Sequence, residues 1–152
     1  MSQMNPTPGP RLSAETIHAS TVATDGRAVM ISGPSGSGKS DLTLRLLDRG
    51  FTLVSDDQTL VKKDSNRLLA SAPPTIAGKL EVRGIGIVDV ERVENVPVAL
   101  IVELTGEIQR LPDDSRERPV LGVKLPLVTI DAMTASAPAK VALALERMGL
   151  KF

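Results

Sequence analysis

The chain has 152 residues, with 18 basic and 18 acidic side chains, no cysteine, and Phe51 and Phe152 as its sole aromatic residues. The balanced charge argues against nucleic acid or an anionic membrane as a partner, and the scarcity of aromatic side chains leaves no platform on which bases would stack. The absence of cysteine excludes disulfides and thiolate metal sites and is compatible with a reducing compartment.

Residues 1–12 are polar and rich in proline, unlike a signal peptide, and no window of the sequence has the apolar length of a membrane span. A chain of this length typically buries about two thirds of the surface that it exposes when unfolded, which suits one core. We therefore expect a flexible tail over 1–12, a single domain over 13–152 and a cytoplasmic location.

The first ordered elements are predicted to be a β-hairpin with strands at 16–24 and 27–32. Asp25 and Gly26 stand between the two strands, and this dipeptide favours the positive φ of a tight turn. The second strand leads directly into a glycine-rich loop.

A helix is predicted at 39–49, because its leucines recur at helical spacing, and Gly50 is its expected C-cap. The apolar run at 51–55 has the length of a short strand. Strand, glycine-rich loop, helix and strand in this order form half of a nucleotide-binding α/β unit.

The remaining elements follow from apolar runs and turn residues. The run at 96–104 is the most continuous and is predicted to be a central strand. The others are a hairpin around 62–67, a proline-broken loop at 71–75, a glycine-interrupted β-branched run at 79–90, a polar stretch at 110–119, an extended stretch at 121–130, and a helix at 137–149 with Val141, Leu145 and Met148 on one face.

The glycine-rich loop matches an eight-position phosphate-binding pattern in full. Its residues are Gly33, Pro34, Ser35, Gly36, Ser37, Gly38, Lys39 and Ser40. Glycines allow successive backbone N–H groups to point inward at an anion, and the following helix adds the positive end of its dipole. Lys39 would reach the terminal phosphates of a nucleotide, and the hydroxyl of Ser40 would face Mg²⁺.

Two adjacent aspartates, Asp56 and Asp57, follow the strand at 51–55. The carboxyl end of a strand beside the phosphate loop is where ligands of open α/β sheets bind. Neighbouring residues of a strand point to opposite faces, so both aspartates can serve one site only where the strand ends or bends. One carboxylate would hold Mg²⁺ while the other accepts a proton from an attacking hydroxyl.

The chain resembles the catalytic domain of the HPr kinase/phosphorylases. The residues that carry this resemblance are the stretch IHASTVATDGRAVMISGPSGSGKSDLTLRLLDRGFTLVSDD and the signature KLEVRGIGIVDV. The resemblance implies an α/β P-loop kinase domain of the HPr kinase/phosphoenolpyruvate carboxykinase-like type, in a minimal form without the family's N-terminal domain. It also implies ATP and Mg²⁺ as cofactors, an HPr-like phosphocarrier protein as acceptor, and a homo-oligomer, a hexamer in this family.

The resemblance also assigns roles to single residues. Asp56 and Asp57 match the family's aspartate pair, one of which accepts the proton; the choice between them stays open, with Asp57 favoured. Glu81 matches a second Mg²⁺ ligand, His18 a functional histidine, and Arg110 an arginine that would stabilise phosphoryl charge.

One part of the sequence departs from the family. The family carries a loop like Pro-Val-Arg-Pro-Gly-Arg after its last strand, which serves dephosphorylation of phospho-HPr, and here the corresponding residues read IDAMTASAPAK. Because both arginines are missing, we expect a kinase with little phosphorolysis activity. Two alternatives remain open from the residues alone: a P-loop kinase of a small molecule or nucleotide, and a sensor that binds ATP without catalysis.

Overall fold

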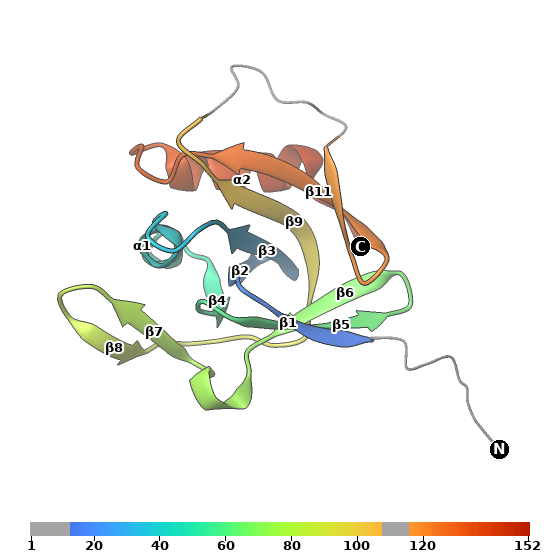
Figure 1. Cartoon of the computed structure of the whole chain (residues 1–152), viewed down its shortest axis with the longest axis horizontal. Helices are drawn as coiled ribbons and strands as arrows, with labels where there is room; N and C mark the ends of the chain where they lie inside the picture. The colour runs from blue at the N-terminus through green and yellow to red at the C-terminus, as the bar shows by residue number, and fades with distance from the viewer. Residues whose placement is uncertain (1–12, 108–115) are drawn as a thin grey trace.

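The computed structural model describes residues 13–107 and 116–152. Its strands are β1 (Ala14–Ile17), β2 (Ser20–Thr24), β3 (Arg27–Ser32), β4 (Thr52–Ser55), β5 (Thr59–Asp64), β6 (Arg67–Ser71), β7 (Lys79–Val82), β8 (Gly86–Asp89), β9 (Val96–Leu104), β10 (Glu117–Val120) and β11 (Val123–Ile130). Its helices are α1 (Lys39–Asp48), α2 (Ala137–Met148) and the 3-10 turn η1 (Pro74–Ile76). Nine strands form one mixed sheet in the order β1-β5-β6-β9-β3-β2-β4, with β11 joined to β9 and β10 to β11 (Figure 1).

The predicted hairpin is confirmed as the antiparallel pair β2 and β3. Asp25 and Gly26 form its turn with φ values of 51° and 73°, the conformation that the sequence favours there. The prediction of one strand over 16–24 is wrong, because the chain turns at His18 and Ala19. The residues before this turn form β1, which pairs with β5 instead of β3. His18 therefore lies in the connection between β1 and β2.

The predicted strand, loop, helix and strand are present as β3, α1 and β4. Arg49 closes the helix and Gly50 follows it with a φ of 106°, as expected of a C-terminal glycine. However, β4 does not lie beside β3, because β2 already occupies that edge as the hairpin partner and pairs antiparallel with both. The crossover therefore skips one strand, and β3 and β4 still end at the same edge of the sheet.

The prediction of a central strand at 96–104 is confirmed. β9 pairs in parallel with β3 on one side and with β11 on the other, and its first residues pair antiparallel with β6. The predicted hairpin around 62–67 is also present, as β5 and β6. The carboxyl ends of β3, β4, β9 and β11 consequently meet along one edge.

The core lies on both faces of this sheet. Side chains alternate along β3: Val29 and Ile31 pack with residues of α1 and α2, whereas Ala28 and Met30 pack with residues of the outer strands. Both helices cover the same face (Figure 1). The predicted C-terminal helix is confirmed, with Val141 buried against this layer.

The strands β7 and β8 form a separate two-stranded sheet that projects from the body as an arm (Figure 1). Leu80 is fully buried at its base, while Ile85 and Ile87 near its tip are 76% and 70% exposed. The arm is therefore anchored on one side and open on the other.

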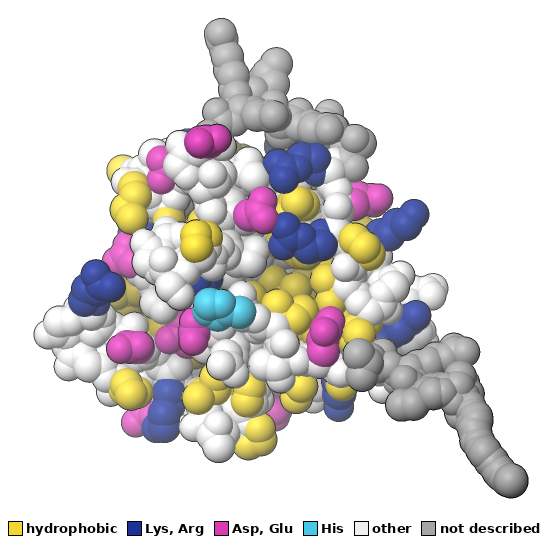
Figure 2. Space-filling view, viewed as in Figure 1, with side chains coloured by type: hydrophobic (Ala, Val, Ile, Leu, Met, Phe, Trp, Pro, Cys, Tyr) yellow, Lys and Arg dark blue, Asp and Glu magenta, His cyan; other side chains and the backbone are white. Residues whose placement is uncertain are grey.

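The visible face in Figure 2 shows basic and acidic side chains interspersed, without a broad patch of one sign. This distribution agrees with the equal numbers of charges in the sequence. None of the helices in the described ranges is long and apolar enough to cross a membrane.

Candidate active site

The loop between β3 and α1 is a tight turn that only glycine fits at several points. Gly36 and Gly38 have φ values of 82° and 98°, which side chains rarely adopt. A Cβ at Gly33 would lie 2.7 Å from the Oγ of Ser37. Gly38 is the N-cap of α1 and no side chain caps this helix end, so its first backbone N–H groups point into the loop without a side-chain acceptor.

Lys39 is the first residue of α1 and is only 7% exposed. Its Nζ donates to the carbonyl oxygens of Gly33, at 2.9 Å, and Pro34, at 3.3 Å. A buried ammonium group needs such acceptors, since leaving its charge unpaired is costly. The lysine therefore folds back over the loop, and its ammonium group lies against the carbonyl oxygens of the loop backbone.

Asp56 joins three separate elements through its carboxylate, which is almost fully buried. Its Oδ1 accepts hydrogen bonds from the Oγ of Ser40 at 2.9 Å and from the Oγ of Ser20 at 3.1 Å. Its Oδ2 accepts the backbone N–H of Glu81 at 3.1 Å. The end of β4 is thereby tied to α1, β2 and β7 at one point.

Asp57 follows in a different environment. β4 ends at Ser55, and Asp57 has a φ of 68°, so the chain turns where the two aspartates stand. Its side chain is 60% exposed, and its Oδ1 lies 2.8 Å from the Nε2 of His18. The predicted condition, that the strand ends or bends at the pair, is confirmed: Asp56 faces α1, whereas Asp57 faces solvent and the histidine.

A layer of buried hydroxyl groups beneath the aspartates was missed by the sequence reasoning. Its members Ser20, Thr21, Ser55 and Thr59 are fully buried. Thr21 and Thr59 lie 2.8 Å apart through their hydroxyl oxygens, and Thr59 donates to the carbonyl oxygen of Ala19 at 2.8 Å. The sequence does show several hydroxyl residues close to the ends of predicted strands. It could not predict this layer, because the hydrogen-bond partners of these residues lie in other strands.

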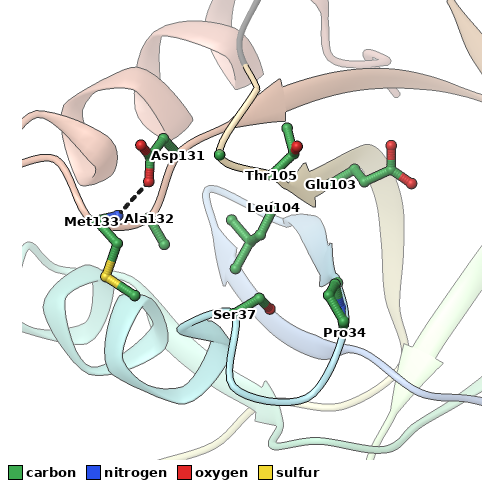
Figure 3. A pocket seen from close by; sticks show the side chains of 10 residues that line it. Pro34, Ser37, Glu103, Leu104, Thr105, Asp131, Ala132 and Met133 are labelled. Atoms are coloured by element: carbon green, nitrogen blue, oxygen red, sulfur yellow. Dashed lines mark hydrogen bonds between the residues drawn. The ribbon is translucent and has the colours of Figure 1, made fainter.

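A cavity of about 490 Å³ opens between the loop and the residues at the ends of β9 and β11 (Figure 3). It is lined by Gly33, Pro34, Ser37, Glu103, Leu104, Thr105, Gly106, Asp131, Ala132 and Met133. Asp131 holds its own loop by accepting the N–H of Met133 at 2.9 Å. Glu103, at the end of β9, pairs with Arg118 at 2.6 Å and with Arg116 at 3.7 Å.

Some of the predicted site residues contact one another in the structure, and others do not. The structure joins Ser40 to Asp56, and Asp57 with His18 adjoins them, whereas the ammonium group of Lys39 binds carbonyl oxygens of the loop. Glu81 meets Asp56 through its backbone, and its side chain is exposed. Arg110 lies outside the described residues. Within the described residues, no group of three or more His, Cys, Asp or Glu side chains is arranged to hold a metal ion.

The fold and this site define an α/β domain in which a glycine-rich loop at a helix N-terminus adjoins a pair of carboxylates. Residues 11–148 match the family described as HPr Serine kinase C-terminal domain. The chain belongs to this family.

Individual relatives agree with the assignment. The chain is similar to HPr kinase/phosphorylase of Burkholderia lata, with 36% identity over 127 residues, and to that of Ralstonia nicotianae, with 37% identity over 127 residues. Each alignment covers 76% of this chain and 39% of the relative. The chain therefore matches well under half the length of these curated relatives.

A solved structure shows the same fold. The Hpr(Ser) kinase/phosphatase from Coxiella burnetii is similar with a TM-score of 0.75 and 30% sequence identity. The match covers 87% of this chain and 94% of the chain in that structure. The mixed sheet with its two helices is thus the fold of the HPr kinase C-terminal domain.

Proposed function

We propose that this protein is an ATP- and Mg²⁺-dependent kinase that transfers the γ-phosphoryl group to a serine of an HPr-like phosphocarrier protein. The observation that carries the proposal is the hydrogen bond between Ser40, at the start of α1, and Asp56, at the end of β4. It joins the glycine-rich loop to the aspartate pair, which are the two parts that phosphoryl transfer requires.

The loop supports nucleotide binding as a P-loop. The uncapped N-terminus of α1 and the positive-φ glycines offer backbone N–H groups to phosphate oxygens, and Lys39 supplies positive charge. We assign the nucleoside to the cavity that Gly33, Pro34 and Ser37 share with the loop, because its volume of about 490 Å³ is within the range of small-ligand sites.

The residues beside the loop also suit Mg²⁺. Ser40 offers a hydroxyl and Asp56 a carboxylate at the same point, and oxygen ligands of these types suit this ion together with water and phosphate oxygens. Glu81 is the proposed further ligand from the arm. When bound, Mg²⁺ would neutralise charge on the phosphate oxygens.

Asp57 is the proposed general base. Its carboxylate is exposed and stands next to the buried Asp56, so a serine hydroxyl of another protein can approach it. The serine oxygen would form a bond to the γ-phosphorus as the bond to the leaving ADP oxygen breaks, and Asp57 would take the hydroxyl proton. His18, 2.8 Å from Asp57, would orient this carboxylate.

The acceptor and the biological setting come from the relatives, which are named HPr kinase/phosphorylase and Hpr(Ser) kinase/phosphatase. We extend to this chain the phosphorylation of HPr and, with it, a role in regulating the phosphotransferase system. A homo-oligomer and a kinase domain of the phosphoenolpyruvate carboxykinase-like type are part of the same proposal. Reverse phosphorolysis is not, because Asp131 to Ala139 contain no arginine.

The decisive experiment incubates the protein with labelled ATP, Mg²⁺ and a candidate HPr, and maps the phosphorylated residue by mass spectrometry. A phosphoserine that requires protein, ATP and Mg²⁺ supports the proposal. Phosphorylation of nucleotides in place of HPr would favour a small-molecule kinase. ATP binding with no transfer to any acceptor would favour a sensor, and an Asp56→Asn, Asp57→Asn double variant would then keep its regulatory output.

A further inference from the structure

Ser20 is the first residue of β2 and is fully buried. Its hydroxyl contacts both members of the aspartate pair: the Oγ donates to the Oδ1 of Asp56 at 3.1 Å and accepts the backbone N–H of Asp57 at 2.9 Å. Within residues 13–107 and 116–152, no other side chain forms hydrogen bonds with both aspartates. Ser20 thus stands between the residue that we assign to the metal and the residue that we assign to the proton.

The direction of these bonds is fixed by chemistry. A backbone N–H can only donate, so Ser20 must accept from Asp57, and its single hydroxyl proton is then directed at the carboxylate of Asp56. The main chain of Asp57 thus donates to Ser20, and Ser20 in turn donates to the side chain of Asp56. A hydrophobic side chain of the same shape would break both bonds at once.

The conformation of Asp57 shows why such a support is needed. A φ of 68° lies in the left-handed region, which aspartate tolerates better than most residues but which still carries a cost in free energy that the surroundings must offset. The contacts that hold this turn include the bond to Ser20, the bond from Gln58 N–H to the carbonyl oxygen of Asp56 at 2.7 Å, the bond from the Ser55 hydroxyl to the carbonyl oxygen of Gln58, and the pair with His18. Of these, the Ser20 bond is the one made to the Asp57 main chain.

We propose that Ser20 is a positioning residue of the kinase, which sets the carboxylate of Asp57 relative to that of Asp56 through its two hydrogen bonds. It acts through these residues and does not touch the nucleotide. The role within catalysis depends on the proposed function, whereas the effect on the geometry of the pair does not. The experiment separates the two.

The variants Ser20→Thr and Ser20→Val are matched, because the two side chains have the same branched shape and the same number of heavy atoms, and only threonine keeps a hydroxyl. We expect Ser20→Val to have a kcat about tenfold below that of Ser20→Thr, with the KM for ATP unchanged within about twofold, as for an interaction made through the proton acceptor. In the Asp57→Asn background, the kcat values of Ser20→Val and Ser20→Thr should differ by less than about twofold, since the effects of substitutions within one hydrogen-bond network are not additive. Ser20→Ala, which adds no atoms, replaces Ser20→Val if that variant does not fold.

A second readout is independent of activity. The chain has one histidine, so the imidazole of His18 gives a single C2-proton resonance in untagged protein, and this group lies against Asp57. At one fixed pH, we expect the chemical shift in Ser20→Thr to match the wild type and that in Ser20→Val to move toward the shift in Asp57→Asn.

Equal kcat values and equal His18 shifts in the threonine and valine variants would overturn the proposal. If wild-type protein phosphorylates no acceptor while the His18 shifts still separate the two variants, the proposed function fails and the positioning of Asp57 by Ser20 stands. If the wild type is active and the variants do not differ in either readout, the positioning role fails and the kinase assignment stands.

Discussion

The Oγ of Ser40 lies 2.9 Å from the Oδ1 of Asp56, although the two residues stand 16 positions apart in the chain. The serine belongs to the first turn of α1 and the aspartate follows β4. The bond therefore joins the helix that follows the glycine-rich loop to the end of the next strand. Substitutions in the loop and in the aspartate pair are therefore expected to affect the same reaction.

We expect Lys39→Ala to lower phosphoryl transfer by about 100-fold or more while the protein stays folded, because the variant loses the positive charge at the loop. Transfer is measured with labelled ATP and folding by thermal unfolding followed by circular dichroism. Lys62→Ala, in an exposed position of β5, serves as control and should keep full activity. A folded Lys39→Ala protein with full activity would show that the charge of Lys39 is not needed for phosphoryl transfer.

The aspartates are expected to differ in their response to Mg²⁺. Asp57→Asn and Asp56→Asn should each reduce kcat by about 100-fold or more, since one loses the proposed proton acceptor and the other the proposed metal ligand. The Mg²⁺ concentration for half-maximal nucleotide binding should rise in Asp56→Asn alone. Nucleotide binding is measured with a fluorescent ATP analogue in a Mg²⁺ titration with an EDTA blank. Small and identical losses in both variants would speak for an ordinary turn.

The reverse reaction is expected to be slow. Phosphorolysis brings inorganic phosphate next to a phosphoserine, and two adjacent anions need concentrated positive charge, which arginine supplies well. In the segment that follows β11, Asp131 adds a negative charge and Lys140 already lies within α2. Phospho-HPr, phosphate and Mg²⁺ should accordingly yield little pyrophosphate with enzyme that phosphorylates HPr readily. Comparable rates in both directions would contradict this expectation.

Stability should depend on the buried side of α1. Leu46 is fully buried in the core under both helices, whereas Leu44 in the same helix is 38% exposed. We expect Leu46→Ala to lower the free energy of unfolding by about 2–5 kcal/mol, because it leaves a cavity in a close-packed layer. Leu44→Ala should cost less than about 1 kcal/mol. Urea denaturation of both variants measures this difference. Equal losses in the free energy of unfolding would contradict the assignment of Leu46 to the core.

The sequence was sufficient for the local elements near the site. Asp25 and Gly26 predict the hairpin turn, the loop pattern predicts a strand before it and a helix after it, and Gly50 predicts where that helix ends. All of these are present in the structure. They were predictable because turn conformation, helix spacing and capping depend on neighbours within a few residues.

Only the tertiary structure decided which distant residues meet. The position of β2 between β3 and β4, the break at His18, and the role of Ser20 between Asp56 and Asp57 depend on strand pairing, and β2 is separated from the aspartates by more than 30 residues. Nothing in the sequence of the buried strand β2 indicates which carboxylate its serine will contact. Its buried hydroxyl must find a partner on folding, and that partner is fixed by the register of neighbouring strands, which the sequence of β2 alone does not specify.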